Sequence, residues 1–300
     1  KARGNEMKVL HLGTPTPGDL EFYSRWEEIG QVSRDDQVKG AEVLVVDHRV
    51  QVTNEFLYSL PCYETIQYLV TPTTGHTHIQ CDLKGIQLIS LRGEKALSEI
   101  TAVAEFVMRQ VLVLARPETG CGMRLRGKSI GIVGYGRIGQ HVSVRASAFG
   151  MQVYKVDKES QGWEWQRLFK LSDFVSIHLP EAEDTQGIIG ANYLSIMKPT
   201  AFLINTSRAS VLNEEALALA LAQGKLAGAA LDMTDRRWWY DEAGSDLVRL
   251  SDHVAGCTKE DRIDTDCMVI AKLKALLPTR RVRENDFYPA KNIQSPQGLL

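Results

Sequence analysis

Residues 129–157, SIGIVGYGRIGQHVSVRASAFGMQVYKVD, contain in order an apolar run, a glycine-rich turn, an amphipathic segment, a second apolar run and an acidic end. Gly134, Gly136 and Gly139 form the pattern G-x-G-x-x-G at the start of the amphipathic segment. The order predicts a strand, a tight turn, a helix and a second strand, with free N–H groups at the helix start facing the pyrophosphate of a dinucleotide. A glycine-rich helix start in another type of α/β protein is the alternative, and the flanking strand and acid favour the dinucleotide.

Four apolar residues of the amphipathic segment share one helical face, which we expect to be buried: Ile138, Val142, Ala146 and Phe149. Arg137 places a cation beside the expected phosphates. Asp157 ends the second strand, where a carboxylate accepts hydrogen bonds from both ribose hydroxyls and repels a 2′-phosphate. The sequence therefore predicts NAD rather than NADP, a preference that the neighbouring Lys158 weakens slightly.

The composition bounds the class of protein. The chain has 300 residues, 44% of them hydrophobic, and a formal net charge of −2, which suits two compact domains and gives no basic excess for nucleic acid. Its longest apolar runs are interrupted or too short to cross a bilayer, and no charged-then-apolar leader opens it, so we expect a soluble, cytoplasmic protein without a membrane partner. The cysteines include no C-x-x-C pair and are expected to be free thiols: Cys62, Cys81, Cys121, Cys257 and Cys267.

Short apolar runs alternate with helical patterns along the whole chain. Strands are expected at 9–12, 43–46, 68–70, 87–91, 174–178, 201–205 and 226–231, and helices at 19–29, 53–60, 98–115, 163–169, 213–223 and 259–277. Continuous apolar strands indicate parallel sheets that are covered on both faces. The fold class is therefore α/β, with two Rossmann-like domains built on doubly wound parallel sheets. We expect one domain to comprise 1–97 plus 264–300, and the other 98–263.

Several ordered motifs together resemble the D-isomer-specific 2-hydroxyacid dehydrogenases. They are GIVGYGRIG from Gly131, AFGMQVYKVD ending at Asp157, SDFVSIHLP from Ser172, LINTSRASVLNEEAL from Leu203, GAALD from Gly228 and SDHVAGCT from Ser251, with TPTTGHTHI and LISLRGEKALSEI nearer the N-terminus. The resemblance implies an active site in the cleft between the two domains. It also implies an NAD-dependent oxidoreductase that interconverts a small D-2-hydroxy acid and its 2-oxo acid by hydride transfer.

Two residues take the family's catalytic positions by this resemblance. Arg208 stands in the N-x-x-R pattern, where a planar guanidinium can hold the carboxylate and keto oxygen of a 2-oxo acid. His253 stands at the histidine position, where an imidazole that titrates near neutrality exchanges the hydroxyl proton. A surface arginine and a satisfied core histidine are the structural alternatives. Arg208 follows a buried strand, at the end where such sheets bind ligands.

The resemblance assigns further binding residues. Thr74, Gly75 and His76 lie in the loop whose backbone N–H groups hold the substrate carboxylate in the family. His76 and His78 alone do not indicate a metal, because no third ligand follows at a useful spacing. The cofactor-binding residues implied by the resemblance complete the set begun in the glycine-rich unit: His178 and Pro180 beside the adenine, Asp232 near the nicotinamide amide, and Thr206, Gly256 and Ile138.

Departures from the family pattern keep a second hypothesis open. Arg237 occupies the position of the glutamate that normally bonds the catalytic histidine, Ala209 replaces a usual glycine, and Asp252 replaces a usual proline. The segment 116–124 is shorter than the arm that embraces a second subunit in the family, which makes the implied homodimer less secure. The alternative function is a catalytically weak or inactive NAD(H)-binding sensor or partner protein on the same scaffold. Retention of Arg208 and His253 favours the enzyme.

Overall fold

The computed structural model of the chain describes residues 7–12, 26–27, 29–34, 36–118, 120–234 and 247–277. The chain divides into two compact units, Lys1–Leu97 with Arg262–Leu300, and Ser98–Asp261. Each unit is built on a parallel sheet, one of five strands and one of six, so the predicted α/β fold class is confirmed.

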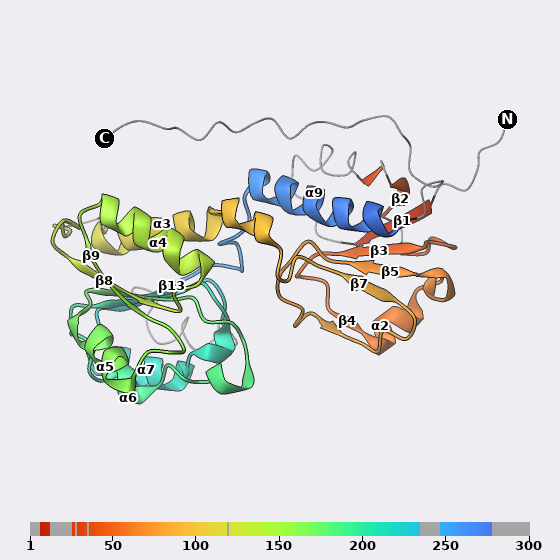
Figure 1. Cartoon of the computed structure of the whole chain (residues 1–300). Helices are drawn as coiled ribbons and strands as arrows, with labels where there is room; N and C mark the ends of the chain where they lie inside the picture. The colour runs from red at the N-terminus through yellow and green to blue at the C-terminus, as the bar shows by residue number, and fades with distance from the viewer. Residues whose placement is uncertain are drawn as a thin grey trace, which may run out of the picture. The chain divides into compact units, whose positions relative to one another are not determined.

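The sheet of the first unit consists of short, apolar, parallel strands. Its order is β2 (Gly30–Ser33), β1 (Met7–Leu12), β3 (Val43–Val46), β5 (Tyr68–Val70) and β7 (Gln87–Ile89). All four residues of β3 are buried, as a strand covered on both faces requires. Helix α2 (Asn54–Ser59) begins at Thr53, whose Oγ1 accepts a hydrogen bond from the Phe56 N–H at 3.1 Å. Helix α9 (Lys259–Leu276) runs along the side of this sheet opposite α2 (Figure 1).

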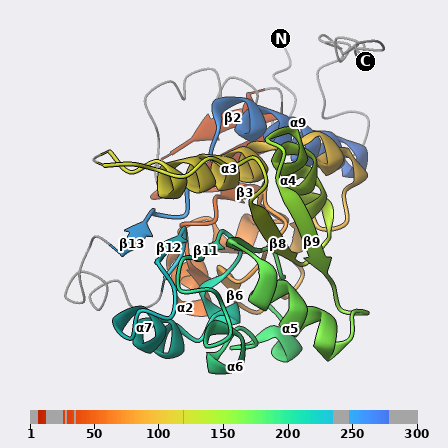
Figure 2. The same ribbon diagram turned by 90° about the vertical axis from the view of Figure 1, so that its left-hand side faces the viewer.

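The sheet of the second unit has six parallel strands and helices on both faces. Its order is β13 (Val248–Leu250), β12 (Gly228–Leu231), β11 (Phe202–Asn205), β10 (Phe174–Ile177), β8 (Ser129–Val133) and β9 (Gln152–Val156). Helices α3 (Ala102–Ala115) and α4 (Arg137–Ala148) cover one face, and α5 (Gly162–Leu171), α6 (Ala191–Leu194) and α7 (Glu214–Ala222) the other (Figures 1 and 2). The direction of winding reverses between β8 and β10, which is where sheets of this kind bind ligands.

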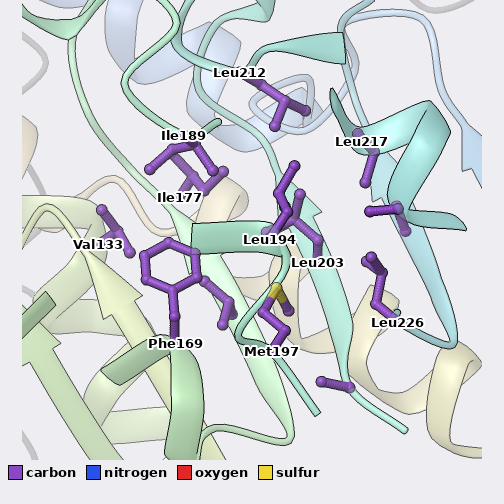
Figure 3. Close-up of a cluster of buried hydrophobic side chains, with 14 of the residues drawn as sticks. Val133, Phe169, Ile177, Ile189, Leu194, Met197, Leu203, Leu212, Leu217 and Leu226 are labelled. Atoms are coloured by element: carbon purple, nitrogen blue, oxygen red, sulfur yellow. The ribbon is translucent and has the colours of Figure 1, made fainter. Parts of the chain in front are cut away.

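The core beneath α5, α6 and α7 fixes these helices on the sheet. Val133, Ile177 and Leu203 project from three adjacent strands and meet Phe169 of α5 and Leu217 of α7 (Figure 3). All five side chains are fully buried. Each such burial contributes about 1.5–3 kcal/mol, so this layer holds the strands in the register that positions their carboxyl ends.

The expected helix 98–115 begins later than its apolar spacing predicts. Residues Lys95–Glu99 form a 3-10 turn, and α3 starts at Ala102. The difference has a physical cause, because two carbonyls that a continuous helix would use internally accept bonds from α4 instead. Arg137 donates to the Ile100 carbonyl at 2.8 Å, and a ring nitrogen of His141 lies 2.8 Å from the Ser98 carbonyl.

Helix α4 ends before Phe149, and the helix expected at 19–29 is described only in part. Phe149 does not join the buried face of α4, since it is 43% exposed. The helix ends at Ala148, and Gly150 at φ +73° turns the chain away, so Phe149 leaves the helical face. Most of the helix expected at 19–29 lies outside the described residues, of which this range contains only Trp26, Glu27 and Ile29.

A charged cluster ties the amino ends of two central strands together. Asp173, which precedes β10, accepts hydrogen bonds from the Ser129 N–H at 2.8 Å, from its hydroxyl at 3.0 Å, and from Lys198 Nζ at 2.8 Å. Burial by itself would raise the pKa of Asp173, but the bonds from Lys198 and Ser129 outweigh it and the pKa is lowered. Because the ionised form is favoured in the folded state, the cluster stabilises the protein above the ordinary aspartate pKa.

We expect Asp173→Asn to reduce the free energy of unfolding by roughly 1–3 kcal/mol at pH 7, because the amide cannot replace the charged acceptor. The difference from the wild type should shrink as the pH falls through the lowered pKa of Asp173, where the wild-type carboxyl also becomes neutral. Urea unfolding between pH 3 and pH 7 measures it. Asp184→Asn, at an exposed aspartate of the same unit, is the control. An equal loss at all pH values would contradict the role of the charge.

Candidate functional site

The strand register brings five of the predicted cofactor residues to one edge of the six-stranded sheet. Val156, Val133, Ile177, Asn205, Leu231 and Leu250 are successive Cα partners across the sheet, so they form one row. The residue after each member of the row therefore leaves the sheet at the same level. These residues are Asp157, Gly134, His178, Thr206, Asp232 and Ser251.

The glycine-rich turn leaves space for a ligand and excludes side chains elsewhere. A Cβ at Gly139 would lie 2.3 Å from the Gly134 carbonyl oxygen, and one at Gly134, which has φ +92°, would lie 2.8 Å from the His178 carbonyl oxygen. A Cβ at Gly136 would meet nothing within 4 Å. Gly139 thus permits close packing of helix on strand, while Gly136 faces open space at the start of α4, where a phosphate can approach the backbone.

Arg137 and Ile138 form the first turn of α4. The Arg137 guanidinium donates a hydrogen bond to the Ile100 carbonyl. Burial lowers its pKa, and the nearby charge of Asp261 opposes that change. Arg137 therefore joins α4 to the segment before α3 and keeps its positive charge near the helix start.

The loop that carries Arg208 is organised by Asn205, the last residue of β11. The Asn205 amide nitrogen donates to the Arg208 carbonyl at 2.9 Å, and its oxygen accepts from the N–H and the hydroxyl of Ser207 at 3.0 and 2.7 Å. The Arg208 guanidinium donates to the Ser207 carbonyl at 2.8 Å. Burial lowers the pKa of Arg208 and the charge of Glu181 opposes this, so the guanidinium stays positive near neutral pH.

The loop that carries His253 is held by Asp232, which is 1% exposed. The Asp232 carboxylate accepts from the Ser251 hydroxyl at 2.6 Å and from the N–H groups of Val254 and Ala255 at 3.0 and 2.9 Å. The His253 N–H donates to the Asp232 carbonyl at 2.7 Å. His253 has φ +51°, and no other described non-glycine residue has a positive φ.

A backbone hydrogen bond joins these two loops. The Asp232 N–H donates to the Asn205 carbonyl at 2.9 Å. Asn205 also holds Arg208, and Asp232 also holds the His253 loop. The structure thus connects the two predicted catalytic residues through two polar residues at neighbouring strand ends. The sequence suggested Asn205 only as part of N-x-x-R and gave no role to Ser251, because their bonding partners follow from the fold.

Two polar atoms at the same edge are buried without a partner among the described residues, namely Thr206 Oγ1 and His178 Nδ1. The other ring nitrogen of His178 lies 2.9 Å from the Ser176 hydroxyl. Burial lowers the pKa of His178 to about 3, so its ring is neutral at physiological pH. Buried polar groups normally find a partner. These two atoms and the open space at Gly136 therefore fit a polar ligand lying along this edge.

Asp157, at the end of β9, makes only local bonds within the described residues. Its Oδ1 accepts from the Lys158 N–H at 3.0 Å, and its own N–H donates to the Ser160 hydroxyl at 3.1 Å. Lys158 Nζ lies 3.6 Å from Glu159 Oε1, so the cation that follows Asp157 in the sequence already has an acidic neighbour. This arrangement suits a carboxylate that receives ribose hydroxyls.

The predicted substrate loop lies in the first unit and is built by residues to which the sequence gave no such role. The Thr71 hydroxyl lies 3.0 Å from the Thr73 hydroxyl and 3.1 Å from His78 Nε2, and Thr73 donates to the Gly75 carbonyl at 2.8 Å. His78 therefore supports the loop. Burial, and then the charge of Arg92, lower the pKa of His76.

Some predicted residues contribute less to this geometry or cannot be placed. Pro180 is exposed, and its carbonyl accepts from the Thr185 hydroxyl at 2.7 Å. Gly256 is exposed, and a Cβ there would lie 3.5 Å from Val103. Arg237, at the usual glutamate position, lies outside the described residues. In the described ranges, His, Cys, Asp and Glu side chains form no group of three that could hold a metal ion, and no helix is long and apolar enough to cross a membrane.

Comparison with known families agrees with the resemblance seen in the sequence. Residues 96–255 match the family described as D-isomer specific 2-hydroxyacid dehydrogenase, NAD binding domain. The chain belongs to the D-isomer-specific 2-hydroxyacid dehydrogenase family.

Particular relatives fall into the same family. The chain is 41% identical over 153 residues to a glyoxylate reductase of Thermococcus litoralis, an alignment that covers 47% of this chain and 46% of that protein. It thus spans about half the length of this relative. It is 30% identical over 273 residues to a glyoxylate reductase of Pyrococcus furiosus, covering 79% of this chain and 80% of that protein. A solved D-lactate dehydrogenase of Aquifex aeolicus, complexed with NAD and lactic acid, superposes with a TM-score of 0.70 at 25% identity, covering 89% of this chain and 95% of that one.

The glycine turn makes a paired prediction. Gly136→Ala should leave the free energy of unfolding within about 1 kcal/mol of the wild type, because the Cβ enters open space at a helix start, but it should weaken NADH binding at least tenfold. Gly139→Ala should instead destabilise the protein by about 1–3 kcal/mol, because its Cβ meets backbone. Thermal unfolding and NADH fluorescence titration measure the two effects. Normal NADH binding by Gly136→Ala would show that this turn does not contact the cofactor.

Proposed function

We propose that this chain is an NAD-dependent oxidoreductase that interconverts a small D-2-hydroxy acid and its 2-oxo acid. The observation that carries the proposal is the hydrogen-bonded connection of the Arg208 loop to the His253 loop at the strand ends that also carry the cofactor candidates. A protein that only bound a dinucleotide would have no chemical need for an arginine and a histidine held in this way. Family membership supports the same reaction class.

The cofactor would lie across the carboxyl edge of the six-stranded sheet. Its pyrophosphate would meet the N–H groups at Gly136 and Arg137, its ribose hydroxyls Asp157, and its remaining polar groups Thr206 and His178. When bound, the nicotinamide supplies or accepts the hydride. The exclusion of side chains at Gly134 and Gly139 and the open space at Gly136 are the features that fit such a ligand.

The protein's own groups would then orient the substrate and move its proton. Arg208 would hold the carboxylate and the keto oxygen with its planar donors, a geometry that a lysine cannot reproduce. His253 would donate a proton to the keto oxygen during reduction and accept the hydroxyl proton during oxidation, an exchange for which an imidazole side chain is suited. By the family resemblance, the backbone N–H groups of Thr74, Gly75 and His76 would bind the substrate carboxylate.

The activity itself is tested by following NADH consumption with glyoxylate, pyruvate, hydroxypyruvate, phenylpyruvate and 2-oxoglutarate between pH 5 and pH 8. We expect turnover of at least one of these 2-oxo acids. Tight NADH binding without turnover at any pH would replace the enzyme by an NAD(H)-binding sensor or partner protein. Arg237, in place of the family's glutamate, is the sequence feature that favours this second function.

Cofactor choice gives a second prediction. NADH should bind at least tenfold more tightly than NADPH, because the Asp157 carboxylate would lie against the 2′-phosphate. Asp157→Asn should bring the Kd for NADPH closer to the Kd for NADH, because NADPH binds more tightly once the carboxylate is gone. Lys158→Gln should leave the Kd for NADH unchanged. Parallel titrations of both cofactors measure the ratio. Equal affinities in the wild type would show that a cation dominates at this position.

A third prediction concerns the arginine. Arg208→Lys should lower kcat/KM roughly 100-fold, or about 2.7 kcal/mol, while the Kd for NADH changes little. The lysine keeps the positive charge but loses the bidentate grip on the substrate. Arg167→Lys, at an exposed position on α5, is the matched control and should be silent. A near-normal kcat/KM in Arg208→Lys would exclude Arg208 from the active site.

A further inference from the structure

The backbone of the His253 loop requires an explanation that the reaction chemistry does not give. At φ +51°, His253 occupies the left-handed region, which L-residues enter at an energetic cost. Such a conformation persists only when surrounding contacts enforce it, and it is concentrated at functional sites. The relevant contacts are therefore those that fix the residues on either side of His253.

The backbone and side-chain contacts that fix these neighbours converge on the end of β12. The Ser251 N–H donates to the Leu231 carbonyl at 3.0 Å, and the His253 N–H donates to the Asp232 carbonyl at 2.7 Å. The Asp232 carboxylate then binds the loop on both sides of the histidine, through the Ser251 hydroxyl before it and the N–H groups of Val254 and Ala255 after it. One buried anion thus closes the turn around His253.

We propose that Asp232 is a positioning residue, whose carboxylate holds His253 in the left-handed conformation and so directs its side chain to the reacting atoms. The role in catalysis rests on the proposed function, while the loop conformation does not. The carboxylate is well suited to this task, because an ionised oxygen accepts several N–H and O–H bonds and such bonds are stronger than neutral ones. The three donors satisfy the accepting oxygens of this buried side chain.

This role differs from that of a nicotinamide contact, and the two make different kinetic predictions. A residue that binds the cofactor amide should affect NADH affinity when changed. A residue that shapes the histidine loop should affect kcat, because the proton donor is displaced while both ligands still bind. The asparagine variant is informative because it keeps the size of the side chain but replaces one accepting oxygen by an NH₂ donor. A donor cannot accept the hydrogen bonds of the loop N–H groups, so at least one of these bonds is lost.

The decisive experiment compares Asp232→Asn with Asp173→Asn, which changes a half-buried, hydrogen-bonded aspartate at the amino end of the same sheet. For Asp232→Asn we expect kcat to fall at least tenfold, with the Kd for NADH and the KM for the 2-oxo acid changing less than threefold. Asp173→Asn should lower stability without changing kcat. A weakened NADH affinity with normal kcat, or no change in either, would overturn the proposal.

Amide hydrogen exchange gives a readout that does not need turnover. In Asp232→Asn the amides of Val254 and Ala255 should exchange at least tenfold faster than in the wild type, and in Asp173→Asn they should not. Unchanged exchange in Asp232→Asn would overturn the positioning role even in an active enzyme. If the wild type turns over no 2-oxo acid, the proposed function fails. The exchange data would still test whether Asp232 holds the conformation of the His253 loop. Should Asp232→Asn not fold, Ser251→Ala removes one donor, and a several-fold fall in kcat with faster Val254 exchange is then expected.

Discussion

The site depends on the common register of six parallel strands. One row of paired residues runs from Val156 to Leu250, so every strand delivers its next residue to the same edge. A slip of one strand by a single residue would turn each of its side chains to the opposite face of the sheet, where the packing is made for other side chains, and would move its terminal polar residue away from that edge. The packing of Phe169 and Leu217 against the sheet, which opposes such a slip, is therefore also what aligns the candidate site.

This dependence explains why the positions of the candidate cofactor residues at this edge could be predicted from the sequence. A mainly apolar run that stops at a polar residue marks both a buried strand and its end, and Asp157, His178 and Asp232 each follow such a run. The glycine spacing was equally informative, because the close approaches at Gly134 and Gly139 leave no room for a Cβ. Local pattern and global packing agree at these positions.

The features that the sequence could not predict are held by bonds between distant segments. Ser251 and Asp232 meet only after the strands pair, and the left-handed backbone of His253 follows from that meeting. The start of α3 was misplaced for the same reason, since Arg137 of another helix takes the Ile100 carbonyl. The apolar spacing along α4 also predicts that Phe149 belongs to the buried face of the helix. The helix ends before this residue, and Gly150 turns the chain and leaves Phe149 exposed.

The left-handed backbone at His253 also limits how this gene can change. Asparagine is among the residues that adopt this conformation most readily, and histidine and asparagine codons differ by one nucleotide. Under the proposed function, a single point mutation would therefore remove the proton donor while the loop and the sheet keep their shape. The scaffold would then stand one mutational step from a folded protein that binds a cofactor without using it.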